Sequence, residues 1–145
     1  MKTLALTFIA LTVSLISNAQ QAVDSLSTTT INVAVPNCHN SDGQMMYALY
    51  TEADFLVRKP FKSAIATIEE GSSHAVFTDV PPGIYAIVVL HDENKNNKMD
   101  FDTNGMPLEY YGTSNNDMTL GPPSFEASKF EVGNDSKTLD FTIKL

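Results

Sequence analysis

The sequence predicts an all-β fold, a single antiparallel β-sandwich of about seven short strands, and three observations support this. Apolar and polar residues alternate in several short segments, which turns one side of each segment toward a core and the other toward water. Residues that favour turns, mainly Gly, Pro, Asn and Asp, separate these segments. No long stretch has the helical period of an amphipathic helix. Segments of this kind bury their apolar sides by packing as two sheets around one core.

The expected strands follow from this alternation, taken in chain order. The first two flank the turn 40–43 and are expected to pair as a hairpin. The segment 84–90 is apolar on both faces, which predicts a central strand. Between the strands, 52–62 is less regular and predicts a short helix or an irregular crossing. The expected strands are 30–35, 44–50, 64–69, 74–80, 84–90, 128–132 and 138–145.

The chain divides into three expected segments. Residues 1–19 begin with a positive charge, continue with an apolar run and end in Ser-Asn-Ala, as in a secretory signal peptide cut after Ala19. The apolar run is shorter than the roughly 20 residues needed to span a bilayer, and no cysteine at the cut offers a lipid anchor. We therefore expect a flexible leader over 20–28, a sandwich domain over 29–145, and an exported protein, either periplasmic or extracellular.

Charge and cysteine content exclude several classes of partner and linkage. The formal net charge is −8, so the chain lacks the basic surplus that binds nucleic acid or anionic lipid, whereas it suits cation binding. The only cysteine, Cys38, has no internal partner for a disulfide. It is expected to be a small, partly buried residue rather than a catalytic thiol, and an intermolecular disulfide stays open.

The segment HDENKNNKMD, residues 91–100, directly follows the most apolar strand and is unusually rich in oxygen-bearing side chains. Counted from Asp92, oxygens recur at alternate positions, as in the calcium loop of an EF-hand. Alternation lets a curled chain aim every second side chain at a hard cation, and amide oxygens add ligands without mutual repulsion. The expected Ca²⁺ ligands are Asp92, Asn94, Asn96, Lys98 through its carbonyl, Asp100, Asp102 and Glu109.

Two departures from the calcium-loop pattern matter. Asn97 stands where a glycine is usual, which is a mild change because asparagine tolerates the left-handed conformation. Thr103 stands where a bidentate glutamate is usual, so Asp100, Asp102 or Glu109 would have to supply the missing ligand. The alternative is an Asn- and Asp-rich loop that caps its own backbone without metal. Zinc is disfavoured, since the three histidines lie in separate segments.

Several segments of the second half of the chain resemble one bacterial family. The matching stretches are FTDVPPGIY at 77–85, AIVVLHDENKNNKMD at 86–100, GMPLEYYGTSN at 105–115 and GPPSF at 121–125. They are similar to domain-of-unknown-function family 2141, small exported proteins. Lys95 or Asn97 replaces the family's loop glycines, and its usual Glu-Gly-Tyr-Gly reads Glu-Tyr-Tyr-Gly at 109–112. The resemblance implies an exported β-sandwich of transthyretin-, immunoglobulin- or carboxypeptidase-regulatory-like architecture, without an established activity.

These observations favour a non-enzymatic exported module that serves a binding or structural role at the cell envelope. The long loop 91–125 would present a contact surface to a glycan, an envelope protein or a second copy, although these side chains could equally pack the loop onto the sheet. One alternative is a hydrolase that uses Asp92, Glu109 or His91 of the 91–112 loop; another is a small-ligand carrier. The expected contact residues are Pro107, Tyr110, Tyr111 and Phe125.

Overall fold

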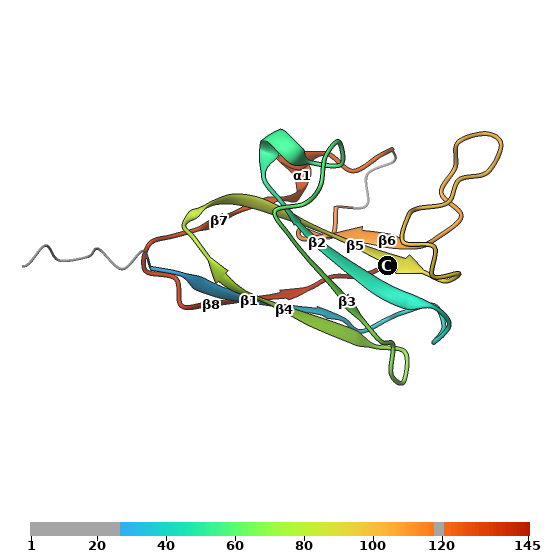
Figure 1. Cartoon of the computed structure of the whole chain (residues 1–145), viewed down its shortest axis with the longest axis horizontal. Helices are drawn as coiled ribbons and strands as arrows, with labels where there is room; N and C mark the ends of the chain where they lie inside the picture. Colours follow the sequence, from blue (N-terminus) through green and yellow to red (C-terminus); the bar gives the residue numbers. More distant parts are fainter. Residues whose placement is uncertain (1–26, 118–120) are drawn as a thin grey trace, which may run out of the picture.

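A computed structural model describes residues 27–117 and 121–145, which form two β-sheets packed face to face (Figure 1). The predicted signal peptide lies outside the described residues, as does all of the predicted leader except residues 27 and 28, which are exposed. The strands are β1 (Thr29–Val35), β2 (Gln44–Tyr50), β3 (Lys62–Ala66), β4 (Ser73–Val80), β5 (Gly83–Asp92), β6 (Tyr111–Thr113), β7 (Lys129–Val132) and β8 (Thr138–Thr142). The helical elements are the 3₁₀ turn η1 (Glu52–Asp54) and the single turn α1 (Phe125–Ser128).

One sheet has three strands in the order β4-β1-β8, and the other has five, with β3-β2-β5-β6 in order and β7 also paired with β5. β6 and β7 share one edge of β5, so β5 is central, as its apolar sequence predicts. Every pairing is antiparallel except that of β1 with β8, which is parallel. The predicted sandwich is confirmed, with eight strands where about seven were expected and with one parallel pair.

The expected hairpin between the first two strands is wrong. β1 pairs with β4 and β8, whereas β2 pairs with β3 and β5 in the opposite sheet. Residues 36–43 therefore carry the chain from one sheet to the other. Both strands bury alternate residues toward the same core, and a connection of this length lets them face each other across it rather than side by side. The alternation of apolar residues shows which side of a strand is buried, but it does not show which other strand pairs with it.

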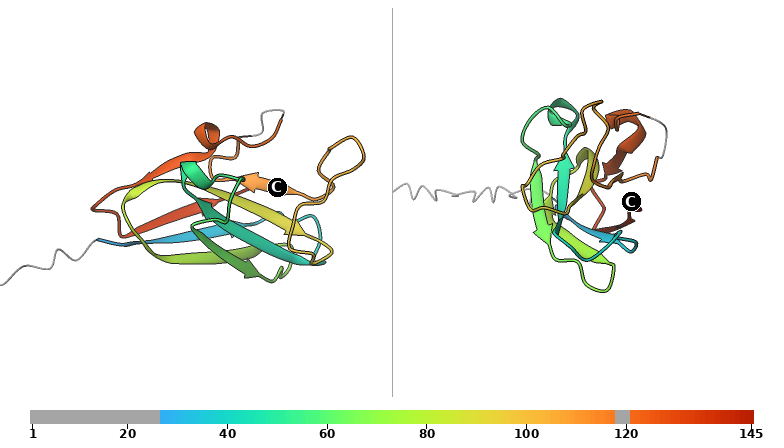
Figure 2. Two further views of the ribbon diagram at one scale, coloured as in Figure 1. Left: turned by 45° about the horizontal axis from the view of Figure 1, so that its top comes forward. Right: turned by 90° about the vertical axis from the view of Figure 1, so that its right-hand side faces the viewer.

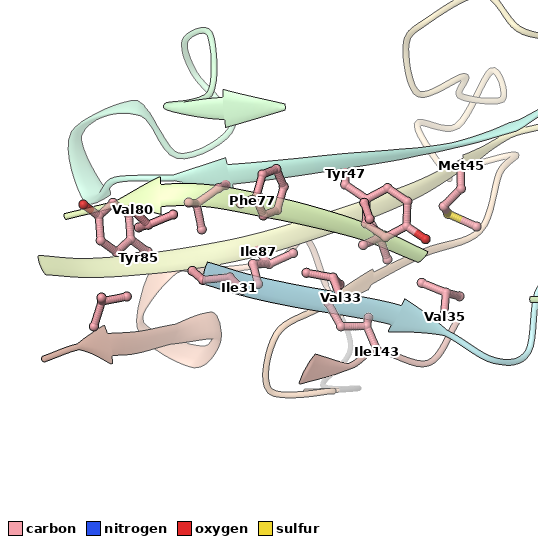
Figure 3. Close-up of a cluster of buried hydrophobic side chains, with 14 of the residues drawn as sticks. Ile31, Val33, Val35, Met45, Tyr47, Phe77, Val80, Tyr85, Ile87 and Ile143 are labelled. Carbon is pink, nitrogen blue, oxygen red and sulfur yellow. The ribbon is translucent and has the colours of Figure 1, made fainter. Parts of the chain in front are cut away.

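The core lies between the sheets and is filled by alternate side chains of β1, β2, β4 and β5 (Figure 3). The inward side chains of β1 and β2 are almost completely buried, including that of Tyr47. Beyond β8, Ile143 closes the core from the three-stranded sheet. The fully buried apolar side chains that Figure 3 labels include Ile31, Val33, Val35, Met45, Val80, Ile87 and Ile143.

A cover of short elements lies on the outer face of the five-stranded sheet (Figure 2). The ring of Phe55, next to η1, meets Tyr50 of β2 and Phe125 of α1 edge-on, at centroid distances of 5.6 and 5.7 Å. β6 lies within the segment 91–125, which was expected to be one long loop. The three residues of β6 pair with β5. Beyond that cover, the chain between β5 and β6 extends past the end of the sandwich (Figure 1).

Candidate functional site

Asp92 is the last residue of β5, and its side chain is fully buried. Its Oδ1 accepts a hydrogen bond from the backbone amide of Asn96 at 3.0 Å, and its Oδ2 accepts one from the amide of Asn97 at 2.9 Å. The chain must therefore curl back over the carboxylate directly after the strand. Lys95 and Asn97 adopt the left-handed conformation within this curl, with φ of 60° and 63°. Asn97 thus takes the conformation that the usual glycine would provide.

Gln44 holds Asp92 from the neighbouring strand. The two residues are register partners in the β2–β5 pair. The Nε2 of Gln44 donates to Asp92 Oδ2 at 2.7 Å and to the Oδ1 of Asn97 at 3.0 Å. One amide group thereby joins the strand end to the curl. Gln44 is not among the predicted site residues, because its role depends on strand register, which the local sequence pattern does not encode.

The turn before β2 packs against the same curl. Asn40 Nδ2 donates to Glu93 Oε1 at 3.0 Å, and the Nε2 of His91 lies 2.9 Å from the carbonyl oxygen of Asp42. A side chain at Gly43 would collide with the backbone, because a Cβ there would lie 2.1 Å from the carbonyl oxygen of Asp92. The turn 40–43 and the loop after β5 are therefore one structural unit.

Three of the predicted ligands meet at the carboxylate of Asp100. The Oδ2 of Asp100 lies 2.5 Å from Asn94 Nδ2 and 2.7 Å from Asn96 Nδ2. The Oδ1 atoms of the two asparagines accept hydrogen bonds from backbone amides two residues further on, those of Asn96 and Lys98, both at 3.0 Å. The loop therefore brings Asn94, Asn96 and Asp100 together while it caps its own backbone.

Two other predicted ligands have separate partners. Glu109 is buried and links two parts of the loop, since its Oε1 accepts the amide of Glu93 at 3.0 Å and its Oε2 that of Asp100 at 3.1 Å. Asp102 Oδ1 accepts the backbone amides of Asn104 and Met106, both at 2.8 Å, within its own turn. Lys98 is exposed on the curl. Glu109 and Asp102 thus stabilise the loop's shape.

Hydrogen bonding also determines the ionisation of two of these carboxyl groups. Burial by itself would raise the pKa of Asp92, but the hydrogen bonds from Gln44 and from the amides of Asn97 and Asn96 outweigh it, and the pKa is lowered. The pKa of Asp102 is lowered chiefly by the Met106 amide. Both groups are therefore anionic at neutral pH.

The four expected contact residues differ in their exposure. Pro107 and Tyr110 are exposed, and Tyr110 stacks on His39 with ring centroids 4.6 Å apart. Tyr111 and Phe125 are half-buried, and Phe125 packs against the aromatic cover of the five-stranded sheet. Two of the predicted contact residues, Pro107 and Tyr110, are thus exposed, and the other two, Tyr111 and Phe125, are half-buried. The more exposed apolar residues of this region are ones not predicted as contacts, namely Phe101, Met106 and Leu108.

The groups that a hydrolase would use are enclosed by the fold. His91 is fully buried and points into the sandwich, with Nε2 at the Asp42 carbonyl and Nδ1 without a hydrogen-bond partner among the described residues. Glu109 and Asp92 are buried and accept hydrogen bonds from backbone amides.

Within residues 27–117 and 121–145, no group of three or more His, Cys, Asp or Glu side chains is placed to hold a metal. Any cation in the loop would therefore need amide and carbonyl oxygens as well.

A hollow of about 260 Å³ lies on the outer face of the three-stranded sheet, and a second, mainly polar one lies beside β3 and the start of β4. The space between the sheets is occupied by the buried side chains of the core. Across the described part of the chain, no helix is long and apolar enough to cross a membrane.

Comparison with known proteins gives one match. Residues 33–140, well over half of the chain, match a family described as an uncharacterized protein conserved in bacteria, DUF2141. Searches of curated proteins and of solved structures give no significant match. The matched range begins in β1 and reaches β8, so it includes both sheets and the whole 92–109 loop. The chain therefore belongs to the DUF2141 family of bacterial proteins.

Proposed function

We propose that this protein is an exported, non-enzymatic β-sandwich module whose loop 92–109 is stabilised by Ca²⁺. The observation that carries the proposal is the convergence of Asn94 and Asn96 on Asp100 Oδ2, at 2.5 and 2.7 Å. These are positions three, five and nine of a loop whose first residue, Asp92, is already fixed by amides of the curl. The proposed ligands are Asp92, Asn94, Asn96, the carbonyl of Lys98, and Asp100.

Calcium binding requires a small rearrangement of the amide side chains. A half-turn about the last bond of Asn94 or Asn96 exchanges its nitrogen for its oxygen at the point of convergence. Ca²⁺ binds about six to eight oxygens, including amide and carbonyl oxygens, and water completes a set that the protein leaves short. The rotation costs the hydrogen bonds that these oxygens accept from backbone amides, so we expect a weak site.

Glu109 acts in this proposal as a support for the loop, whereas Asp102 holds only its own turn through the amides of Asn104 and Met106. Glu109 fixes the amides of Glu93 and Asp100 and so sets the ends of the segment that carries the ligands. A weak site fits the predicted export of the protein, because calcium sites in extracellular modules work at dissociation constants of about 10⁻⁴ to 10⁻³ M. The partner of such a module would be a glycan, an envelope protein or another copy of the chain.

The test is thermal unfolding of the protein without its signal peptide, in EDTA and in rising concentrations of Ca²⁺. Binding to the folded state alone stabilises it, by about 1.4 kcal/mol at ten times the dissociation constant. For a domain of this size we expect a rise in Tm of about 4 °C. The Asp100→Ala variant should lose this rise.

Asp102→Ala is the matched control, because it removes the same charge from the same loop but outside the point of convergence. It should keep the calcium-dependent rise in Tm. The proposal fails if the Tm of the wild type is the same in EDTA and in Ca²⁺, or if Asp102→Ala loses the rise as completely as Asp100→Ala.

A further inference from the structure

The segment over residues 56–62, which follows η1 and leads into β3, exposes several large apolar side chains. Leu56 is 47% exposed, Val57 77% and Phe61 44%. η1 and the turn after it lie on the outer side of the five-stranded sheet, away from the three-stranded sheet (Figures 1 and 2). Single exposed apolar residues are common on proteins, whereas a group of them on one projecting element is characteristic of a contact surface.

The turn that carries Leu56 and Val57 is held in a strained conformation. Leu56 has a φ of 55°, in the left-handed region that bulky residues rarely adopt. The carbonyl oxygen of Asp54 accepts the amides of Val57 and Arg58, at 3.2 and 3.1 Å, and the ring of Phe55 anchors the base of the turn in the aromatic cover. Backbone strain of this kind clusters at binding sites. The fold thus keeps an apolar side chain in water at a position whose backbone glycine would adopt more easily.

The same segment is the most basic part of an acidic chain. Residues 55–68 contain Arg58, Lys59 and Lys62 but no acidic residue, and these are three of the nine Lys and Arg residues in a chain of net charge −8. Arg58 and Lys59 are exposed. Within the described residues, the ion-pair partner of Arg58 is Asp54, with 3.9 Å between Nη1 and Oδ1. A contact this long and exposed neutralises little of the charge.

The net charge of the whole chain does not decide how this segment binds. At 0.1 M salt, exposed charges separated by more than about 10 Å are largely screened from each other. An anionic surface that touches the 56–62 segment therefore interacts mainly with the cations there. The net charge predicts weak binding of anionic lipid for the chain as a whole, and this segment is a local exception.

We propose that the 56–62 segment docks this protein onto a membrane that carries anionic phospholipid. Leu56 and Val57 would enter the boundary between headgroups and acyl chains, while Arg58 and Lys59 would bind lipid phosphates. Aliphatic side chains next to basic ones suit this boundary, because the long basic side chains keep their charged ends at the headgroups. The contact goes beyond the proposed calcium site and does not use Ca²⁺, so either proposal can fail without the other.

An acidic polysaccharide would also attract the basic side chains, but it suits the apolar ones less well. Such a polymer is hydrated along its length and offers no apolar layer to remove Leu56 and Val57 from water. A bilayer offers both the anionic headgroups and the apolar layer. The combination of charge and aliphatic exposure on one strained turn therefore favours a membrane.

The test is co-sedimentation of the protein without its signal peptide with lipid vesicles, in EDTA. The vesicles contain phosphatidylcholine alone or an equal mixture with phosphatidylglycerol. We expect binding to the mixed vesicles that weakens as salt concentration rises. The double variant Arg58→Gln/Lys59→Gln should bind about twentyfold more weakly, since each basic residue near an anionic surface contributes roughly fivefold. The matched control Lys137→Gln/Lys144→Gln removes two exposed positive charges elsewhere and should bind as the wild type does.

Leu56→Gly separates binding from folding. Glycine adopts a positive φ without strain, so this variant should keep or raise the melting temperature of the wild type. It should nevertheless bind the mixed vesicles at least about fivefold more weakly, because it removes an apolar side chain from the contact. Val57→Ser should weaken binding similarly. Val76→Ser changes a side chain that is 48% exposed on β4 and should leave binding unchanged.

Three results would overturn the proposal. The first is a wild type that stays in solution with the mixed vesicles at low salt. The second is a loss of binding in Lys137→Gln/Lys144→Gln as large as that in Arg58→Gln/Lys59→Gln. The third is vesicle binding that neither Leu56→Gly nor Val57→Ser weakens, since the contact would then be one of charge alone. Binding to alginate but not to the mixed vesicles would assign the segment to an acidic polysaccharide instead.

Discussion

Gly43→Ala should destabilise the domain by on the order of 4 kcal/mol, far more than a typical surface substitution. The φ of Gly43 is +72°, and a Cβ there would lie 2.1 Å from the carbonyl oxygen of Asp92 and 2.5 Å from the Cα of Glu93. Both atoms are backbone, so a rotamer change cannot relieve the clash. The end of β5 and the turn before β2 would have to separate, which would also break the contact of His91 with the Asp42 carbonyl.

Urea-induced unfolding measures this loss, and Gly105→Ala is the matched control. Gly105 has a similar φ of +79°, but a Cβ there would meet no atom of the described residues within 4 Å, so only the conformational cost of about 1 kcal/mol applies. The difference between the two variants isolates the contact with Asp92. Equal losses in both variants would show that the turn and the loop do not depend on each other.

Asp92→Ala should cost about 3 kcal/mol at neutral pH, because it leaves the amides of Asn96 and Asn97 and the Nε2 of Gln44 without their acceptor. These donors meet a buried anion, and hydrogen bonds to charged acceptors are stronger than neutral ones. Equilibrium unfolding in denaturant measures the loss. Asp140→Ala, which removes an exposed carboxylate with a single side-chain partner, should cost much less.

The same comparison predicts a pH dependence. The pKa of Asp92 is lowered in the folded state from its ordinary value of 3.8, so its contribution to stability is full above that value. As pH falls through the folded-state pKa, the carboxylate is protonated and the contribution is lost. The stability difference between the wild type and Asp92→Ala should therefore shrink in this acidic range. A difference that stays constant there would contradict the assigned role.

The strands were predictable where one side of a segment is exposed to solvent. β1 and β8 alternate apolar and polar residues, and their inward residues are those that the sequence places on one side. Their partners were not predictable: residues 36–43 have the composition of a hairpin turn and instead cross between sheets. β6 was missed because it is three residues long with a glycine at its centre, too short for any period to be visible.

The candidate site was predictable only as far as local spacing determines it. The alternation from Asp92 to Asn96 predicts a curl, and the structure shows that curl. Gly43 and Gln44 lie at the start of β2, the strand that pairs with β5. Nothing in the sequence around Asp92 indicates that these two residues contact it. The same holds for Glu109, whose contacts with Glu93 and Asp100 depend on how the loop folds back.

The parallel pairing of β1 with β8 determines the order in which the domain can assemble. Asn32 and Asp140, neighbours in that pair, are 108 positions apart along the chain. Joining them costs loop-closure entropy before any contact compensates, and sheets rich in such distant pairs fold in about milliseconds to seconds. Until β8 docks, the edge of β1 and the apolar face beneath it stay open to other chains. The interval between synthesis of β1 and arrival of β8 is thus the period in which this protein is most prone to aggregate.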